Sequence, residues 1–171
     1  GGLKFYETAH VKDVVAHLKL FINPKDELAW SRVLLLIEGI GIRTAEKLLD
    51  EIRSGTDEAS IRRVLARHGS GRPYSRGIGR LSGLIAGPQD ESTPSRLCEA
   101  VVAYYEPILR EKFDLDWNLR KNDLEALVQL AGRYDALRDF LVALALEPPE
   151  RGVKDFQDTV WERPLLLSTL P

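Results

Sequence analysis

The sequence predicts an all-α fold, a multi-helix domain with short strand-like segments at its two ends. Two observations predict it: apolar residues recur at helical spacing along most of the chain, and alternation with a period of two is nearly absent. The strand-like exceptions are residues 3–6 and 165–169. With 171 residues and an apolar content of 44%, the chain can form one domain with a core, or a domain with a small satellite.

Four helices are predicted before residue 70. Apolar residues at helical spacing predict an amphipathic helix over 11–22, which Asn23 and Pro24 end. The next helix is expected to use Asn23 as its cap and Pro24 as its first residue, and to run to about residue 36. The same spacing predicts helices over 43–53 and from about residue 58 to Gly69.

The second part of the chain is predicted to contain four further helices separated by loops. Residues 69–79 and 87–94 are rich in Gly, Pro and Ser, so we expect loops there, with a short helix over 81–86 between them. Longer helices are predicted over 95–113, 119–133 and 135–146. Pro107 is expected to kink or interrupt the first of these three.

Charge is distributed unevenly between the two halves. The 24 basic and 26 acidic residues give a net charge of −2, which argues against a surface coated with basic residues. Residues 1–80 nevertheless carry 14 basic and 10 acidic residues, whereas residues 81–171 carry 10 and 16. Any nucleic acid is therefore expected to bind the first half.

Cysteine, histidine and hydropathy exclude several other classes of site. One cysteine, Cys98, excludes an internal disulfide and is expected to be buried. The three histidines are scattered, so we expect no structural metal. No apolar run near 18 residues and no charged-then-apolar leader occurs, so no membrane partner and a cytoplasmic location are expected.

The most informative motif is Gly39-Ile40-Gly41, which lies between the helices predicted over 30–36 and 43–53. This order predicts a helix-hairpin-helix, in which the free N–H groups of the second helix face a DNA phosphate and the glycines leave room for it. Arg43 and Lys47 would add charge, Thr44 a hydroxyl, and Ile40 would pack between the helices. The simpler alternative is a helix cap and turn without a ligand.

Other candidates are weaker. A second Gly-Ile-Gly at 77–79 lacks the Thr-Ala that follows the first. Six arginines after the hairpin either extend a phosphate-binding face or form an ordinary solvated surface: Arg62, Arg63, Arg67, Arg72, Arg76 and Arg80. A DNA glycosylase with Asp57 as its aspartate is the enzyme alternative, but Asp57 fits an ordinary helix start. His17 is expected to be a packed or surface imidazole.

Longer stretches resemble one family. "GGLKFYETAHVKDVVAHLKLFINPKD" at 1–26, the Gly-Ile-Gly hairpin, "YYEP" at 104–107, "RYDALRDFLVALALEPP" at 133–149 and "PLLLST" at 164–169 carry the resemblance. Together they resemble the second-domain region of UvrD/PcrA/Rep-type helicases of superfamily 1, over nearly the whole chain. The chain departs from the family at Thr8-Ala9-His10, where an Arg-Glu-type pair is usual, and at Glu38, which puts a negative charge near the hairpin.

The resemblance implies the helical subdomain called 2B over residues 9–152, flanked by the edge of the second RecA-like domain at 1–8 and a return segment at 153–171. It implies duplex DNA, or a duplex/single-strand junction, and the remaining helicase domains as partners. No Gly-x-x-x-x-Gly-Lys-Ser/Thr loop occurs in the 171 residues, and no acidic ATPase motif, so we expect a non-catalytic fragment without a cofactor. ATP and Mg²⁺ are expected for the parent helicase. The alternative is a regulatory module that binds a neighbouring domain or a repair partner.

Overall fold

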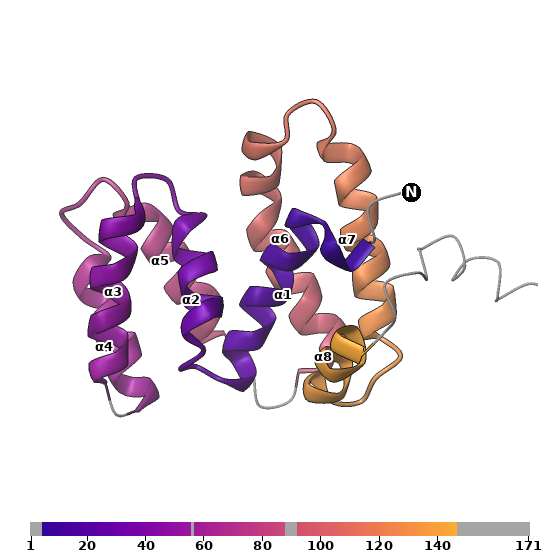
Figure 1. The fold of residues 1–171 in the computed structure, drawn as a ribbon, viewed down its shortest axis with the longest axis horizontal. Coiled ribbons are helices and arrows are strands. Elements are labelled where there is room, and N and C mark those ends of the chain that lie inside the picture. Colours follow the sequence, from indigo (N-terminus) through magenta and orange to yellow (C-terminus); the bar gives the residue numbers. More distant parts are fainter. Residues whose placement is uncertain (1–4, 56, 88–91, 147–171) are drawn as a thin grey trace, which may run out of the picture.

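The computed structural model describes residues 5–55, 57–87 and 92–146, and these ranges are helical (Figure 1). A short 3-10 helix, η1 (Phe5–Glu7), precedes the α-helices. The α-helices of the described ranges are α1 (Ala9–Ile22), α2 (Glu27–Leu35), α3 (Ile42–Ser54), α4 (Glu58–His68), α5 (Ser75–Ala86), α6 (Pro94–Lys112), α7 (Trp117–Ala131) and α8 (Leu137–Leu146). These ranges contain no strand, which confirms the all-α class.

The helices form two lobes on either side of α1 (Figure 1). Helices α2 to α5 make the first lobe, and α6 to α8 make the second lobe. Helix α1 places Ala16 and Leu20 in the apolar core of the first lobe. It places Val11, Val14 and Leu18 in the core of the second lobe. Because α1 is buried on both sides, it belongs to both cores at once.

Polar side chains are buried where α1 meets the second lobe. The carboxylate of Asp13, 1% exposed, accepts hydrogen bonds from Arg32 Nε and Tyr105 Oη, each at 2.6 Å, and from Lys112 Nζ at 3.5 Å. Burial and the bond to Asp13 raise the pKa of Tyr105, so its hydroxyl stays a donor. This network joins α1, α2 and α6 at one point.

Two buried histidines extend this polar contact along α1. His10 lies within 2.9 Å of Asp123 Oδ2 and 3.1 Å of Arg120 on α7. His17 donates from Nδ1 to the carbonyl of Asp13 at 2.7 Å, while its buried Nε2 has no partner among the described residues. Burial lowers the pKa of His17 to about 4, so the ring is neutral. It is a packed imidazole, as expected from the sequence.

The strand expected at 3–6 is wrong for its described residues, because Phe5 and Tyr6 lie in η1. Thr8 accounts for the turn, since its Oγ1 donates to the carbonyl of Phe5 at 2.7 Å and its N–H donates to the same oxygen at 3.3 Å. Phe5 of this turn is buried in the core of the second lobe. The strand expected at 165–169 lies outside the described residues.

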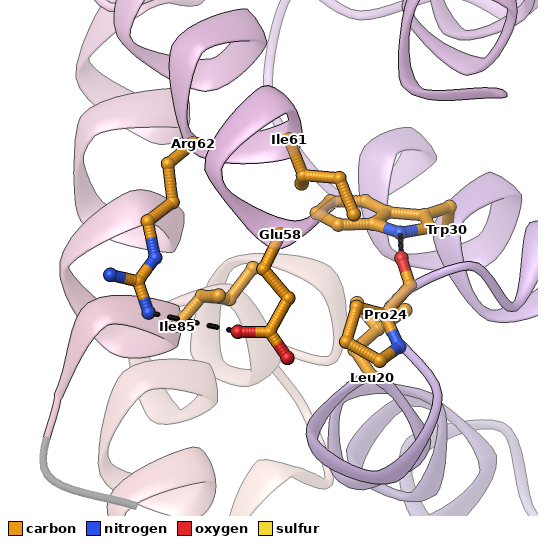
Figure 2. A pocket seen from close by; sticks show the side chains of 7 residues that line it. All are labelled: Leu20, Pro24, Trp30, Glu58, Ile61, Arg62 and Ile85. Carbon is orange, nitrogen blue, oxygen red and sulfur yellow. Dashed lines mark hydrogen bonds and ion pairs between the residues drawn. The ribbon is translucent and has the colours of Figure 1, made fainter. Parts of the chain in front are cut away.

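The start of α2 also differs from the prediction. Asn23 is the C-cap of α1, and the cap of α2 is Asp26, which accepts a hydrogen bond from the N–H of Ala29 at 2.9 Å. Pro24 stays outside the helix because its carbonyl accepts from Trp30 Nε1 at 2.7 Å (Figure 2). Figure 2 also shows the small hollow beside Trp30, whose volume of about 20 Å³ suits a single water molecule.

Helix α5 begins at Ser75, so the loop predicted over 69–79 is wrong for its last five residues. A Cβ at Gly77 would lie 2.2 Å from Ile37 Cγ2, so glycine is needed there for α5 to approach the end of α2. A Cβ at Gly79 would meet nothing within 4 Å. The second Gly-Ile-Gly is therefore part of a packed helix and not a hairpin.

The remaining helices follow the prediction closely. Helix α6 runs without interruption through Pro107, which was expected to kink or interrupt it. Tyr105 and Leu109, both fully buried, anchor the helix on either side of the proline. Cys98 is fully buried, as expected, and burial raises the pKa of its thiol to about 12.

Candidate nucleic-acid interface

The turn between α2 and α3 spans residues 36–41 and is anchored by two buried isoleucines. Ile37 is 5% exposed and Ile40 is 6% exposed, and both belong to the core of the first lobe. The N–H of Ile40 donates to the carbonyl of Ile37 at 3.0 Å, which closes the turn. Gly39 has a φ of +83°, which favours glycine over any other residue. The conformation of the turn thus explains Gly39 without a ligand.

Gly41 has no such explanation. It caps α3 with φ −94° and ψ 177°, a conformation open to any residue, and a Cβ there would meet nothing within 4 Å. Asp, Asn, Ser or Thr would cap the helix with a side chain, whereas Gly41 leaves the first turn of α3 without a side-chain cap. The exposed backbone N–H groups at this end carry the positive end of the helix dipole. The fold tolerates a better cap at this position than the residue it has.

The charged residues around Gly41 point into solvent. Arg43 and Lys47 are exposed, one turn apart on α3, and Thr44 is half-buried. Neither Arg43 nor Lys47 has an ion pair or hydrogen bond with another described residue. Glu38, also exposed, is the acidic side chain within the turn itself. Two cations and one carboxylate therefore surround the uncapped helix end.

Ile42 is a surface residue that the sequence analysis did not single out. It is the first residue of α3 and is 70% exposed. The helical spacing of Ala45, Leu48 and Ile52 was the available signal, because it places Ile42 outside the buried face of α3. An exposed isoleucine beside an uncapped helix end offers an apolar contact next to a polar one.

The connection between α4 and α5 lies against this turn. A Cβ at Gly39 would lie 3.6 Å from Tyr74 Cβ and 3.7 Å from Pro73 Cβ. The Tyr74 hydroxyl contacts His68 Nδ1 at 3.3 Å, and His68 Nε2 contacts a Glu51 carboxylate oxygen at 3.1 Å. Tyr74 is thereby held between α3, α4 and the turn. Figure 1 shows both connections at the same end of the first lobe.

The six arginines that follow the α2–α3 turn in the sequence fall into different environments. On α4, Arg62, Arg63 and Arg67 pair with carboxylates at 3.9, 3.8 and 3.1 Å. Arg80 donates to the carbonyl of Tyr104, toward the second lobe, at 2.9 Å. Arg72 lies over the Tyr74 ring at 6.0 Å, and Arg76 is exposed with no partner among the described residues. Of the six, Arg72 belongs to the connection that borders the turn, and Arg76 lies in the first turn of α5.

Asp57, the candidate aspartate of the glycosylase alternative, caps α4. Its Oδ1 accepts from the N–H of Ser60 at 2.8 Å, and the Ser60 hydroxyl completes a capping box. These hydrogen bonds lower the pKa of Asp57. Within the described ranges, no three His, Cys, Asp or Glu side chains are grouped as metal ligands, and no helix is both long and apolar enough to cross a membrane.

Comparison with known proteins relates the N-terminal part of the chain to DNA helicases. Residues 1–61 match the family model of the UvrD-like helicase C-terminal domain. A stretch of 49 residues is 37% identical to the ATP-dependent DNA helicase PcrA of Bacillus subtilis (strain 168) and covers 28% of this chain. A stretch of 62 residues is 40% identical to DNA helicase II of Haemophilus influenzae and covers 36% of this chain.

These stretches cover 7% of the PcrA protein and 8% of DNA helicase II. The family match includes α1, α2, the turn with both glycines, and α3, and it ends within α4. The resemblance to UvrD/PcrA-type helicases is confirmed for this part of the chain. Its assignment to subdomain 2B, and the boundaries at residues 8 and 153, stay predictions.

Proposed function

We propose, from the relationship of residues 1–61 to UvrD-like helicases, that this chain is a 2B-type piece of an ATP-dependent DNA helicase and binds the backbone of duplex DNA. The turn between α2 and α3 makes the contact, at a duplex or a duplex/single-strand junction. Hydrolysis of ATP with Mg²⁺ belongs to the remaining domains of the parent protein, which are the chain's other partners. A cytoplasmic location is part of the same proposal.

The observation that carries this proposal is the contrast between Gly39 and Gly41. Gly39 is required by its positive φ, so it says nothing about a ligand. Gly41 is exposed, unstrained and free of steric crowding, yet it occupies a position where a capping side chain stabilises a helix. A phosphate that accepts hydrogen bonds from the N–H groups of α3 would take the place of that side chain. Its binding would explain why residue 41 is glycine.

The chemistry of the surrounding residues suits a phosphate and no particular base. Arg43 and Lys47 supply charge, Thr44 supplies a hydroxyl, and Ile42 offers an apolar face to the deoxyribose. Such contacts hold the backbone and leave the bases uncontacted. Glu38 opposes the phosphate, so the isolated chain is expected to bind weakly, with a Kd of roughly micromolar or poorer.

Gly41→Asp tests the proposal most sharply because it separates binding from folding. As a helix cap, the introduced carboxylate should leave α3 as stable as in the parent or more stable, while its charge repels a phosphate. We expect duplex binding to be lost, measured by fluorescence anisotropy, with the melting temperature unchanged or raised. Gly83→Asp adds the same charge at an exposed glycine of α5 and is the matched control. Equal binding by Gly41→Asp and the parent chain would refute the site.

Single charge changes give a graded version of the same test. Arg43→Ala and Lys47→Ala should weaken duplex binding without changing sequence preference, and Glu38→Ala should strengthen it. Each lost phosphate contact should reduce the magnitude of the slope of log affinity against log salt concentration by about 0.9. Arg43 should matter more than Lys47, since it lies nearer the start of α3. An unchanged affinity and slope for Arg43→Ala would place the DNA surface elsewhere.

A second candidate function is the binding of another protein through the second lobe. Leu115, in the connection between α6 and α7, is 100% exposed, and Leu119, four residues later on α7, is 70% exposed. Exposed leucines of this kind favour a protein contact. Leu115→Ser combined with Leu119→Ser should then weaken association with the purified remainder of the helicase and leave duplex binding unchanged. Unchanged association would remove this candidate.

A further inference from the structure

We propose that the connection between α4 and α5, together with the first turn of α5, is a second phosphate-binding segment that acts through Arg72 and Arg76. Its fixed position beside the α2–α3 turn makes the chain prefer duplex DNA. The inference rests on the proposed function, since it adds a second contact to the same ligand. It goes further by naming two arginines that the turn motif does not contain. It also attributes the preference for duplex DNA to the fixed distance between the turn and this second segment.

Pairing separates these two arginines from the others nearby. A guanidinium that already faces a carboxylate must give up that partner to bind a phosphate. The three arginines of α4 each have such a partner, at 3.1 to 3.9 Å. Arg72 and Arg76 have no carboxylate partner among the described residues, and both are exposed. A phosphate can therefore bind Arg72 and Arg76 without breaking an ion pair between described residues.

The connection is held in place by its own hydrogen bonds. The N–H of Arg72 donates to Ser75 Oγ at 3.0 Å, and that hydroxyl donates to the carbonyl of His68 at 3.2 Å. Tyr74, 7% exposed, anchors the segment through its contact with His68. Arg72 and Arg76 therefore start from a backbone that is already ordered, which lowers the entropy lost on binding.

Two close contacts set the distance between this segment and the turn. Gly39 packs against Pro73 and Tyr74, and Gly77 packs against Ile37, where even a methyl group would lie 2.2 Å from Cγ2. Both contacts join residues of the α2–α3 turn to residues of the connection or of α5. The two candidate phosphate contacts are thus parts of one packed unit and cannot move independently.

A fixed spacing favours the more rigid ligand. Phosphates of a duplex keep set distances from one another, so two preplaced contacts can engage them together. A single strand can adapt to either contact alone but must be ordered to reach both, which costs conformational entropy. Glu38 in the turn and Glu46 on α3 are exposed acidic residues, so they offset part of the positive charge that Arg43, Lys47, Arg72 and Arg76 supply. The preference therefore comes from geometry more than from total charge.

The first test removes the two charges. For the full chain, we expect the double variant Arg72→Ala/Arg76→Ala to bind a blunt duplex at least tenfold more weakly than the parent at about 0.1 M salt. The slope of log affinity against log salt concentration should be smaller in magnitude by about 1.8. Arg62→Ala/Arg63→Ala is the matched control, since it removes the same charge from α4, and should change affinity less than twofold. Equal effects of the two double variants would overturn the proposal, because only overall charge would then matter.

The second test changes the spacing and leaves every charge in place. Gly77→Ala pushes α5 away from Ile37, so the ratio of duplex to single-strand affinity should fall, while single-strand affinity stays the same. Gly79→Ala adds the same methyl group to the same helix in open space and should keep the parent ratio. An unchanged ratio in folded Gly77→Ala would overturn the role of the spacing. If that variant does not fold, the arginine variants still decide the proposal.

The outcomes distinguish this inference from the proposed function. Weakening by Arg43→Ala without weakening by Arg72→Ala/Arg76→Ala would overturn the second segment and leave the turn as the DNA site. Absence of duplex binding by the parent chain at low salt would overturn both. Weakening by both sets of variants, with the α4 control unchanged, supports two contacts on one duplex.

Discussion

The two lobes are attached to α1 by different kinds of contact. Toward the first lobe α1 presents small and apolar side chains, Ala16 and Leu20, to a core whose other members are apolar apart from Tyr74 and the indole of Trp30. Toward the second lobe it presents apolar residues together with His10, Asp13 and His17, and these three are at most 2% exposed among aromatic and charged partners. One helix thus joins an apolar core to a core that contains buried polar groups, and Asp13 also reaches α2 through Arg32.

The difference predicts different weaknesses. Apolar packing depends on volume, so the first lobe should be sensitive to added or removed atoms. A buried polar network depends on every partner being present and in the right protonation state, so the second lobe should be sensitive to single polar substitutions and to acid. Four measurements sharpen or break this comparison, in order of decreasing effect.

The largest effect is expected from Asp13→Ala. It leaves Arg32, Lys112 and Tyr105 without their common acceptor, and removing one partner of a buried ion pair costs about 3 kcal/mol or more. Tyr105→Phe removes one hydrogen bond and should cost about 1 kcal/mol. Urea unfolding followed by circular dichroism measures both. A smaller loss for Asp13→Ala than for Tyr105→Phe would show that the network does not hold the second lobe.

Acid should destabilise the chain through His17. The folded chain keeps this ring unprotonated down to about pH 4, whereas the unfolded chain protonates it below about pH 6.5, so stability is complete above pH 6.5 and falls toward pH 4. The slope for this one group is roughly 1.4 kcal/mol per pH unit. His17→Leu should flatten the loss, because leucine binds no proton in either the folded or the unfolded chain. Parallel pH profiles for parent and variant would exclude His17 as the cause.

In the first lobe, the expected effect depends on the position of one methyl group. Gly77→Ala should destabilise the chain by about 1–3 kcal/mol, because its methyl group overlaps the side chain of buried Ile37. Gly79→Ala should stabilise it by about 0.5–1 kcal/mol, because alanine favours a helix and meets nothing. Thermal unfolding of the two variants gives the comparison. Stabilisation by both substitutions would mean that α5 does not need the close contact.

The smallest effect is expected from Glu27→Gln. Glu27 and Arg53 join α2 and α3 by two hydrogen bonds, at 2.7 and 2.8 Å, and this pairing lowers the pKa of Glu27. The pair is exposed to solvent, which screens it, so its loss should hardly change the urea midpoint. A loss as large as that of Asp13→Ala would remove the distinction between exposed and buried pairs.

Much of the helical fold could be predicted from the sequence alone. Amphipathic spacing is a local property, so it located the helices around Val14, Leu48 and Leu127 within a few residues. The same reasoning placed Cys98 in the core and identified Asp57 as a helix start. Gly39-Ile40-Gly41 was also found as a break between two helices, although its role as a DNA contact stays a proposal.

The tertiary structure decided what depends on residues far apart in the chain. Gly77 was predicted to lie in a loop. Glycine is needed there because Ile37, forty positions away in the sequence, packs against it. Pro24 lies outside α2 because Trp30 donates to its carbonyl, and the sequence shows the proline but not the hydrogen bond. Burial of Asp13 likewise requires donors from α2 and α6, which no local pattern predicts.

The arginines show the same division between sequence and structure. Their positions after the hairpin were evident from the sequence, which predicted a basic first half of the chain. Their availability was not, because the pairing of Arg67 with Glu51 of α3, and the packing of Pro73 against Gly39, arise only when the chain folds. Helix formation follows from residues three or four positions apart, whereas a binding surface depends on which side chains of different helices become neighbours.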